Sequence, residues 1–293
     1  MHGVVMDLSA QMIWQGVVNG LALGWIYVLM ALGLTLIFGI MHIMQFAHGE
    51  IYMIGAYVVY YLCSGLGLLL VPAAVLAMLC LAGFGLFLER FLFRRLKEDW
   101  LAAVVAALGL TLILQSGAVV VFGLYERSIP VLAQGPLNIL GTVVPKDRVV
   151  AVAVAVGLSS ALYIFLKTTK YGQAMVASAQ NPEGAMLQGI GPDRMAALCM
   201  AIGFALAAAG GTLAGALFTI SPYMGLSPLI KGCTIIVLGG MGSLPGAFIA
   251  GMTLGLIDGL VPILFGHAWA AIGPLLVVIL ILVIKPQGLL GHE

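Results

Sequence analysis

Long apolar stretches alternate with short polar connections along the whole chain. The apolar stretches cover residues 12–40, 51–63, 66–88, 101–124, 149–166, 195–220, 229–238, 247–265 and 268–284. A helix needs about 20 predominantly apolar residues to cross the hydrocarbon core of a bilayer. The pattern therefore predicts eight or nine membrane spans, several of them irregular.

These spans are predicted to be helices. Lipid offers no partners to backbone N–H and C=O groups, so only helices and closed barrels can cross it. A barrel would show segments of about ten residues with alternating polarity, whereas this chain has continuous runs of Leu, Ala, Val and Ile. We expect an all-α polytopic bundle that forms a single membrane domain over residues 1–293.

Composition excludes a water-soluble protein. Hydrophobic residues make up 62% of the chain and charged residues only 8%, against about 25% charged residues in soluble domains. The basic residues are scattered over several short connections and form no stripe of the kind that binds nucleic acid. Membrane lipid is an expected partner, and nucleic acid is not.

The distribution of Lys and Arg predicts the orientation, because these residues favour cytoplasmic loops. They gather in two connections, with Arg90, Arg94, Arg95 and Lys97 in the first and Lys167, Lys170 and Arg194 in the second. Both connections are expected on the cytoplasmic side and the tract 125–148 between them outside. Lys285 then predicts a cytoplasmic C-terminus, and a single crossing by residues 12–40 predicts an N-terminus outside.

Two segments interrupt the apolar pattern, residues 39–49 (GIMHIMQFAHG) and residues 239–246 (GGMGSLPG). Each follows a comparable stretch, LGLTLIFG at 32–39 and KGCTIIVLG at 231–239. Broken spans and two related halves are common in transporters. We therefore expect broken or re-entrant helices and two weakly related halves.

The first interruption carries Gln45, His48 and Glu50. Ionisable side chains inside a membrane are costly and usually functional, so a role in the translocation path or its gate is one interpretation. Glu50 as a helix-capping carboxylate is the alternative, since residues spaced i, i+2 do not face each other on a helix. The spacing of the histidines does not match a metal-binding pattern, and no metal is expected.

The second interruption is rich in glycine and allows either tight helix packing or a re-entrant element near the path. Its candidate path residues are Gly239, Gly240, Gly242 and Ser243. It has no phosphate-binding G-x-x-x-x-G-K-[ST] pattern, so this chain is not expected to bind ATP. Lys231, another candidate path residue, and Asp258 should face protein or water, and their pairing is a guess. Glu89 and Arg90 are expected to reach toward the headgroups.

The cytoplasmic connection 168–194 is predicted to contain a short helix at residues 182–188. Asn181 is a good N-cap, Pro182 suits the first helical position, Glu183 complements the helix dipole and Gly189 can end the helix in a left-handed conformation. Its apolar surface comprises Ala185, Met186 and Leu187. The helix either lies on the lipid headgroups or docks a partner.

Three segments carry a resemblance to a known family. Residues 181–190 (NPEGAMLQGI) resemble the E-A-A-x-x-x-G signature of ABC importer permeases, with Gly184 in place of its first alanine. Residues 33–57 and 222–251 resemble the two hallmark stretches of the branched-chain amino acid permease family, the LivH type. All three occur in the family's order, so the chain is identified as a member.

The resemblance implies a permease subunit that couples ATP hydrolysis on separate ATPase subunits to substrate translocation across a bacterial cytoplasmic (inner) membrane. It implies two ATPase subunits that hold ATP and magnesium, a second homologous permease, and an extracytoplasmic binding protein that delivers a branched-chain amino acid. Residues 181–189 would form the ATPase-coupling element. This chain itself would bind no cofactor.

Three alternatives remain open. A permease of the same family could carry urea or short amides. A proton-coupled secondary transporter would use His48, Glu50, Lys231 or Asp258 as its titrating group. An intramembrane enzyme ranks last, because no nucleophile with a base and no set of metal ligands occurs at an interpretable spacing, and no catalytic residue is expected.

Overall fold

The structure is a computed structural model that describes residues 10–129, 133, 135–139, 142–266, 269–285 and 288–290. Its elements, in chain order, are α1 (Ala10–Met41), α2 (His48–Leu66), α3 (Leu70–Phe91), the short 3-10 helix η1 (Phe93–Arg95), α4 (Trp100–Phe122), β1 (Pro136–Ile139), β2 (Thr142–Pro145), α5 (Lys146–Thr168), α6 (Lys170–Gln180), α7 (Pro182–Leu187), α8 (Pro192–Leu217), α9 (Leu226–Gly239), α10 (Leu244–Phe265) and α11 (Trp269–Ile284). Most of each predicted apolar stretch lies on one of these helices. The all-α bundle is confirmed.

Six of the described helices, or pairs of adjoining helices, are long and apolar enough to cross a membrane, and α1 is a single unbroken helix. The number of spans stays a prediction, since α2, α9 and α11 fall outside that set. The predicted positions of the two termini concern residues 1–9 and 291–293, which lie outside the described residues.

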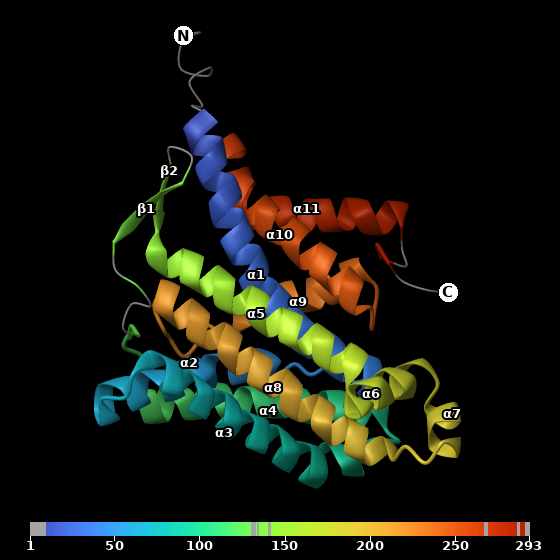
Figure 1. Cartoon of the computed structure of the whole chain (residues 1–293). Coiled ribbons are helices and arrows are strands. Elements are labelled where there is room, and N and C mark those ends of the chain that lie inside the picture. The colour runs from blue at the N-terminus through green and yellow to red at the C-terminus, as the bar shows by residue number, and fades with distance from the viewer. Residues whose placement is uncertain are drawn as a thin grey trace.

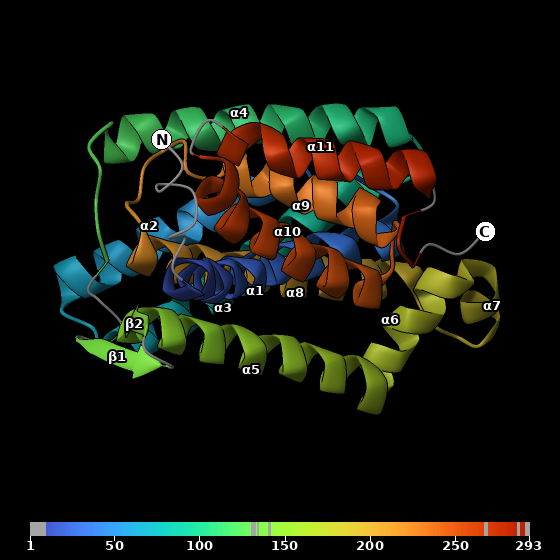
Figure 2. The same cartoon turned by 90° about the horizontal axis from the view of Figure 1, so that it is seen from above.

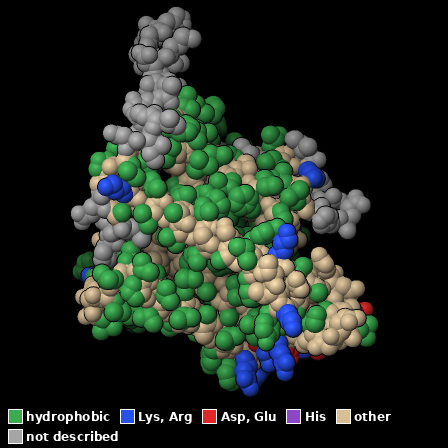
Figure 3. Space-filling view, in the orientation of Figure 1, with side chains coloured by type: hydrophobic (Ala, Val, Ile, Leu, Met, Phe, Trp, Pro, Cys, Tyr) green, Lys and Arg blue, Asp and Glu red, His purple; other side chains and the backbone are tan. Residues whose placement is uncertain are grey.

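Helices α1 and α8 form the centre of the bundle. In each of them 72% of the most apolar stretch of 18 residues is buried, compared with 11% in α4 and 22% in α5. Figure 2 shows the arrangement from above, with α4 and α11 along one side, α5 along the other, and α1 and α8 between them. The outer helices therefore leave broad apolar surfaces for lipid or for another subunit (Figure 3).

The connections separate to two ends of the bundle. The antiparallel hairpin of β1 and β2 lies at one end, and α6 and α7 project at the other (Figure 1). The two basic connections meet at the α6–α7 end, where Lys97 Nζ lies 3.2 Å from Asp193 Oδ1. They therefore share one side of the bundle, as the predicted orientation requires.

Glu89 differs from the prediction that it reaches toward the headgroups. Its side chain is buried and accepts two hydrogen bonds from Arg94, at 3.0 Å from Nε and 2.7 Å from the guanidinium Nη2. A buried carboxylate needs such a partner, and the bidentate guanidinium geometry supplies it. Arg90 is exposed, and its reach toward the headgroups stays a prediction.

Glycines spaced by four residues bring α1 and α10 into backbone contact. Gly16, Gly20 and Gly24 on α1 face a matching series on α10, which consists of Gly251, Gly255 and Gly259. In lipid, helices associate through van der Waals packing, and small residues permit the closest approach. This ladder fixes the position of α10 against the central helix.

Replacing Gly255 by alanine should loosen this contact. A Cβ there would meet the backbone of Gly24 and lie 2.6 Å from Gly20 O, and overpacking of this kind costs about 1–3 kcal/mol. We expect a lower thermal unfolding midpoint for Gly255→Ala in detergent. The control, Gly157→Ala on α5, has no neighbouring atom within 4 Å and should unfold at the wild-type midpoint; equal midpoints for the two variants would contradict the packing role.

Candidate functional site

The first interruption is a non-helical segment that begins at the exposed His42 and then runs into the bundle. Helix α1 ends at Met41, His42 has a positive φ of 55°, and α2 begins only at His48. Between them the chain is held by turns, such as the hydrogen bond from His48 N to Gln45 O at 3.1 Å. Non-helical backbone at membrane depth is tolerated only where protein or a water-filled cavity surrounds it. Burial of Gln45 and Ala47 meets that requirement.

Helix α2 begins deep within the bundle, beside the middle of α8. The imidazole of His48 packs edge-on against Phe204, with 6.0 Å between ring centroids. On the other side it faces α1, where a Cβ added to Gly33 would lie 3.0 Å from His48 Nε2. The predicted break is therefore a broken span whose second helix starts inside the protein.

The first turns of α2 and α9 meet at a contact that we call the helix-start junction, formed by Gly49 and Gly225. Each is buried and lies against the other's backbone, and a Cβ on Gly49 would also lie 2.9 Å from Leu229 Cβ. Helix N-termini carry free N–H groups and partial positive charge. In transporters with broken helices such N-termini face anionic groups of the substrate, and here two helix starts meet inside the bundle.

The polar side chains beside the junction are buried without hydrogen-bond partners among the described residues. This holds for both ring nitrogens of His48, both carboxylate oxygens of Glu50 and Oε1 of Gln45. The Gln45 amide nitrogen reaches only Met200 Sδ, at 3.8 Å. Buried polar groups normally have partners, and exceptions require an explanation. Glu50 makes no side-chain hydrogen bond at the start of α2, although its place in the first turn still suits the helix dipole.

Lys231 and Asp258 form an ion pair between α9 and α10, so the pairing that the sequence left as a guess is present. Tyr27 of α1 completes the group: its hydroxyl donates to Asp258 Oδ2 at 2.7 Å and accepts from Lys231 Nζ at 2.7 Å. The ammonium also lies 4.6 Å from the tyrosine ring centroid. As predicted, both charges face protein. No sequence pattern singles out Tyr27, because tyrosine is common in apolar stretches.

The second interruption is a tight turn between α9 and α10. Gly240 and Gly242 have positive φ values of 99° and 84°, and Ser243 Oγ accepts a hydrogen bond from Gly246 N at 3.1 Å where α10 begins. Gly239 packs against the backbone of Gly246. The glycines thus serve a sharp turn and close packing, and the structure places them at the α6–α7 end rather than beside His48.

Both interruptions border one cavity near this end. A Cβ on Gly39 would lie 3.5 Å from Gly242 Cα, so the end of α1 and the α9–α10 turn are neighbours. The cavity has a volume of ≈ 480 Å³, and α6 contributes Met175 and Val176 to its wall. The predicted path residues therefore occupy three places: Gln45, His48 and Glu50 near the junction, Lys231 in the ion pair, and the glycines and Ser243 here.

The predicted short helix is present as α7. Asn181 Oδ1 accepts a hydrogen bond from Gly184 N at 2.8 Å, Pro182 occupies the first turn, and Gly189 has a positive φ of 79°. Leu187 is 87% exposed, whereas Ala185 is buried against the chain. Most Lys and Arg visible in Figure 3 lie toward this end. The helix therefore projects an apolar tip from the basic end of the molecule.

Comparisons with known proteins agree with these features. Residues 16–284 match the family model described as "Branched-chain amino acid transport system / permease component". The chain is 33% identical to the high-affinity branched-chain amino acid transport system permease protein LivH of Escherichia coli K12, and 32% identical to the corresponding BraD of Pseudomonas aeruginosa, each over 95% of both chains. The probable LivH of Methanocaldococcus jannaschii is 27% identical, over 98% of this chain and 94% of that protein.

A solved structure shares the fold. It is PsaBC from Streptococcus pneumoniae in complex with Fab, with a TM-score of 0.51 and 14% sequence identity over 92% of this chain and 91% of the matched chain. At that identity the likeness concerns the arrangement of helices alone. With the match over nearly the whole chain and the full-length relatives, the chain belongs to the family of branched-chain amino acid transport permeases.

Proposed function

We propose that this chain is the transmembrane permease subunit of an ATP-binding-cassette importer for branched-chain amino acids in a bacterial cytoplasmic membrane. The observation that carries the proposal is α7, a capped helix whose apolar tip projects from the basic end of a membrane-spanning bundle. A surface of this shape suits insertion into a groove on an ATPase subunit. The family membership supports the same assignment.

The proposed assembly has a second homologous permease, two ATPase subunits that hold ATP and magnesium, and an extracytoplasmic substrate-binding protein. Translocation would pass between the permeases, with the C-terminus and α7 on the cytoplasmic side and the N-terminus outside. The binding protein would supply most of the selectivity. The helix-start junction would act on a substrate that has already been selected.

Reconstitution tests the proposal directly. The chain, its partner permease, the ATPase subunits and the binding protein are placed in proteoliposomes, and uptake of radiolabelled leucine, isoleucine, valine, urea and a short amide is measured. We expect uptake of the branched-chain amino acids that requires ATP. Uptake by this chain alone, driven by a proton gradient, would instead establish a secondary transporter. Uptake of urea or the amide without uptake of the amino acids would change the assigned substrate to that compound.

Changes in α7 should uncouple transport from ATP hydrolysis. Gly189 has a φ of 79° and donates from its N–H to Met186 O at 2.9 Å, whereas proline fixes φ near −65° and lacks the N–H. Gly189→Pro, and Glu183→Lys in the first turn, should abolish ATP-dependent uptake and the copurification of ATPase subunits while the protein remains inserted. Glu126→Lys repeats the charge reversal on an exposed residue at the hairpin end and should retain the ATPase subunits; retention by the α7 variants as well would refute the coupling assignment.

Substitutions of the buried polar side chains beside the helix-start junction should lower transport without affecting assembly. Glu50→Gln keeps the size of the side chain but removes its charge, and His48→Ala removes the imidazole. A charged hydrogen-bonding group contributes about 1.5–3 kcal/mol, so we expect transport to fall about tenfold with the ATPase subunits still bound. The control is Thr212→Val, since Thr212 is buried but bonds only to Ala208 O of its own helix, at 2.8 Å. Unchanged transport in Glu50→Gln would favour the capping interpretation.

A further inference from the structure

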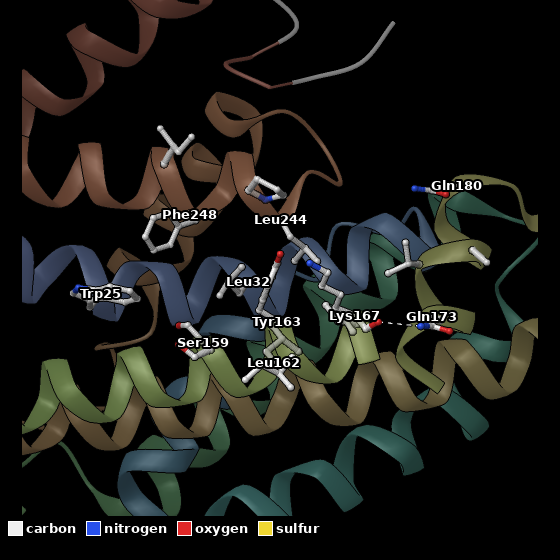
Figure 4. Close-up of a pocket in the computed structure, with 17 residues that line it drawn as sticks. Trp25, Leu32, Ser159, Leu162, Tyr163, Lys167, Gln173, Gln180, Leu244 and Phe248 are labelled. Carbon is white, nitrogen blue, oxygen red and sulfur yellow. Dashed lines mark hydrogen bonds between the residues drawn. The ribbon is translucent and has the colours of Figure 1, made fainter. Parts of the chain in front are cut away.

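An apolar groove runs between α1, α5 and α10 and ends against α6 (Figure 4). We call it the α5–α10 groove. It has a volume of ≈ 1090 Å³, and Trp25, Leu162, Tyr163 and Phe248 are among its lining residues. In Figure 2 the α5 side of the bundle lies opposite α4 and α11. Ile164 of α5 also lines the groove and is 57% exposed, so the groove is open at that side chain.

The charged group and the side-chain amides of the groove lie at one end, whereas Ser159 lies near Trp25 at the other. Figure 4 shows Lys167, Gln173 and Gln180 on one side and Trp25 and Phe248 toward the other. Lys167 lies in the last turn of α5, and its carbonyl oxygen accepts a hydrogen bond from Gln173 Nε2 at 2.9 Å. Its ammonium lies 5.7 Å from the Tyr163 ring centroid. No acidic side chain is among the described residues that line the groove, so its charge is positive and confined to the α6 end.

We propose that the α5–α10 groove binds an anionic phospholipid, with an acyl chain along the apolar wall and the phosphate at Lys167. An acyl chain suits the length and apolar lining, because a flexible hydrocarbon chain can make van der Waals contacts all along such a wall. The head group accounts for the cation and the amides at one end only, since basic residues at the cytoplasmic edge of a bilayer attract anionic lipids. Lys167 belongs to one of the two basic connections, and so lies at the depth where a cytoplasmic-leaflet phosphate is available.

Other occupants fit the groove less well. A zwitterionic amino acid would bring a second positive charge beside Lys167, and the described lining offers no carboxylate to pair with its ammonium group. A helix of another subunit packs closely in lipid where small residues form the contact. Among the described residues, the lining contains no glycine and has bulky side chains at Trp25, Tyr163 and Phe248. A flexible chain can fill the irregular surface that such side chains leave.

Lipid titration of the purified, delipidated full chain tests the proposal. The thermal unfolding midpoint is measured with phosphatidylglycerol, with phosphatidylcholine of the same acyl chains, and with inorganic phosphate. We expect phosphatidylglycerol to raise the midpoint most and phosphate alone to leave it unchanged. In Lys167→Gln, apparent binding of phosphatidylglycerol should weaken about tenfold, because a hydrogen bond to a charged group contributes about 1.5–3 kcal/mol.

Two further variants make the outcome decisive. Arg95→Gln removes one exposed charge from the same end but outside the groove and should keep wild-type lipid binding. Ser160→Trp places a large ring in the groove from an exposed position and should remove stabilisation by both lipids. An equal loss of phosphatidylglycerol binding in Lys167→Gln and Arg95→Gln would show an effect of general surface charge and would overturn the proposed site. The proposal also fails if Ser160→Trp binds lipid normally. A Ser160→Trp variant that no longer assembles with the partner permease, in a preparation without bound lipid, would show that the groove receives a subunit and would also overturn the proposal.

Discussion

Close approach of helix backbones inside the membrane is the constraint on which the other features of this bundle depend. Lipid tails are as apolar as the side chains, so burial of leucine gives little preference for one helix neighbour over another. The glycine ladder between α1 and α10, and the contact of Gly33 with Gly203 on α8, let three backbones meet instead. That registration also places Tyr27 against Lys231 and Asp258, and sets the end of α1 beside the α9–α10 turn.

The same central packing makes the broken span possible. Residues 43–47, which follow the exposed His42, could not remain non-helical against lipid, because their backbone groups would lose their partners. Enclosed between α1 and α8, they let α2 start within the bundle and bring its first turn to Gly225. This arrangement buries an imidazole and a carboxylate without partners among the described residues, which lowers stability. A transport role would explain why such a cost is tolerated.

Local signals in the sequence predict most of the fold but few of its long-range contacts. Hydropathy locates the helices, and Asn181, Pro182 and Gly189 define α7, because capping depends on adjacent residues alone. The pairing of Glu89 with Arg94 and the role of Tyr27 depend on which helix faces become neighbours. The helix-start junction also escapes prediction, since Gly49 and Gly225 are far apart in the chain and identified only by their contact. The α5–α10 groove is formed by residues of four helices and has no local sequence pattern.

The geometry links the two ends of the proposed transport cycle through α9. This helix of 14 residues begins at the helix-start junction and ends at Gly239, beside the cavity that α6 helps to line. Displacement of α7 by an ATPase subunit would move α6 and change the width of the cavity that separates α6 from the turn that follows α9. Because a helix is stiff along its axis, the shift would reach Gly225 and its contact with Gly49. The polar atoms of His48 and Glu50 beside that contact would then change their surroundings, which is how a cytoplasmic motion could open or close a path inside the membrane.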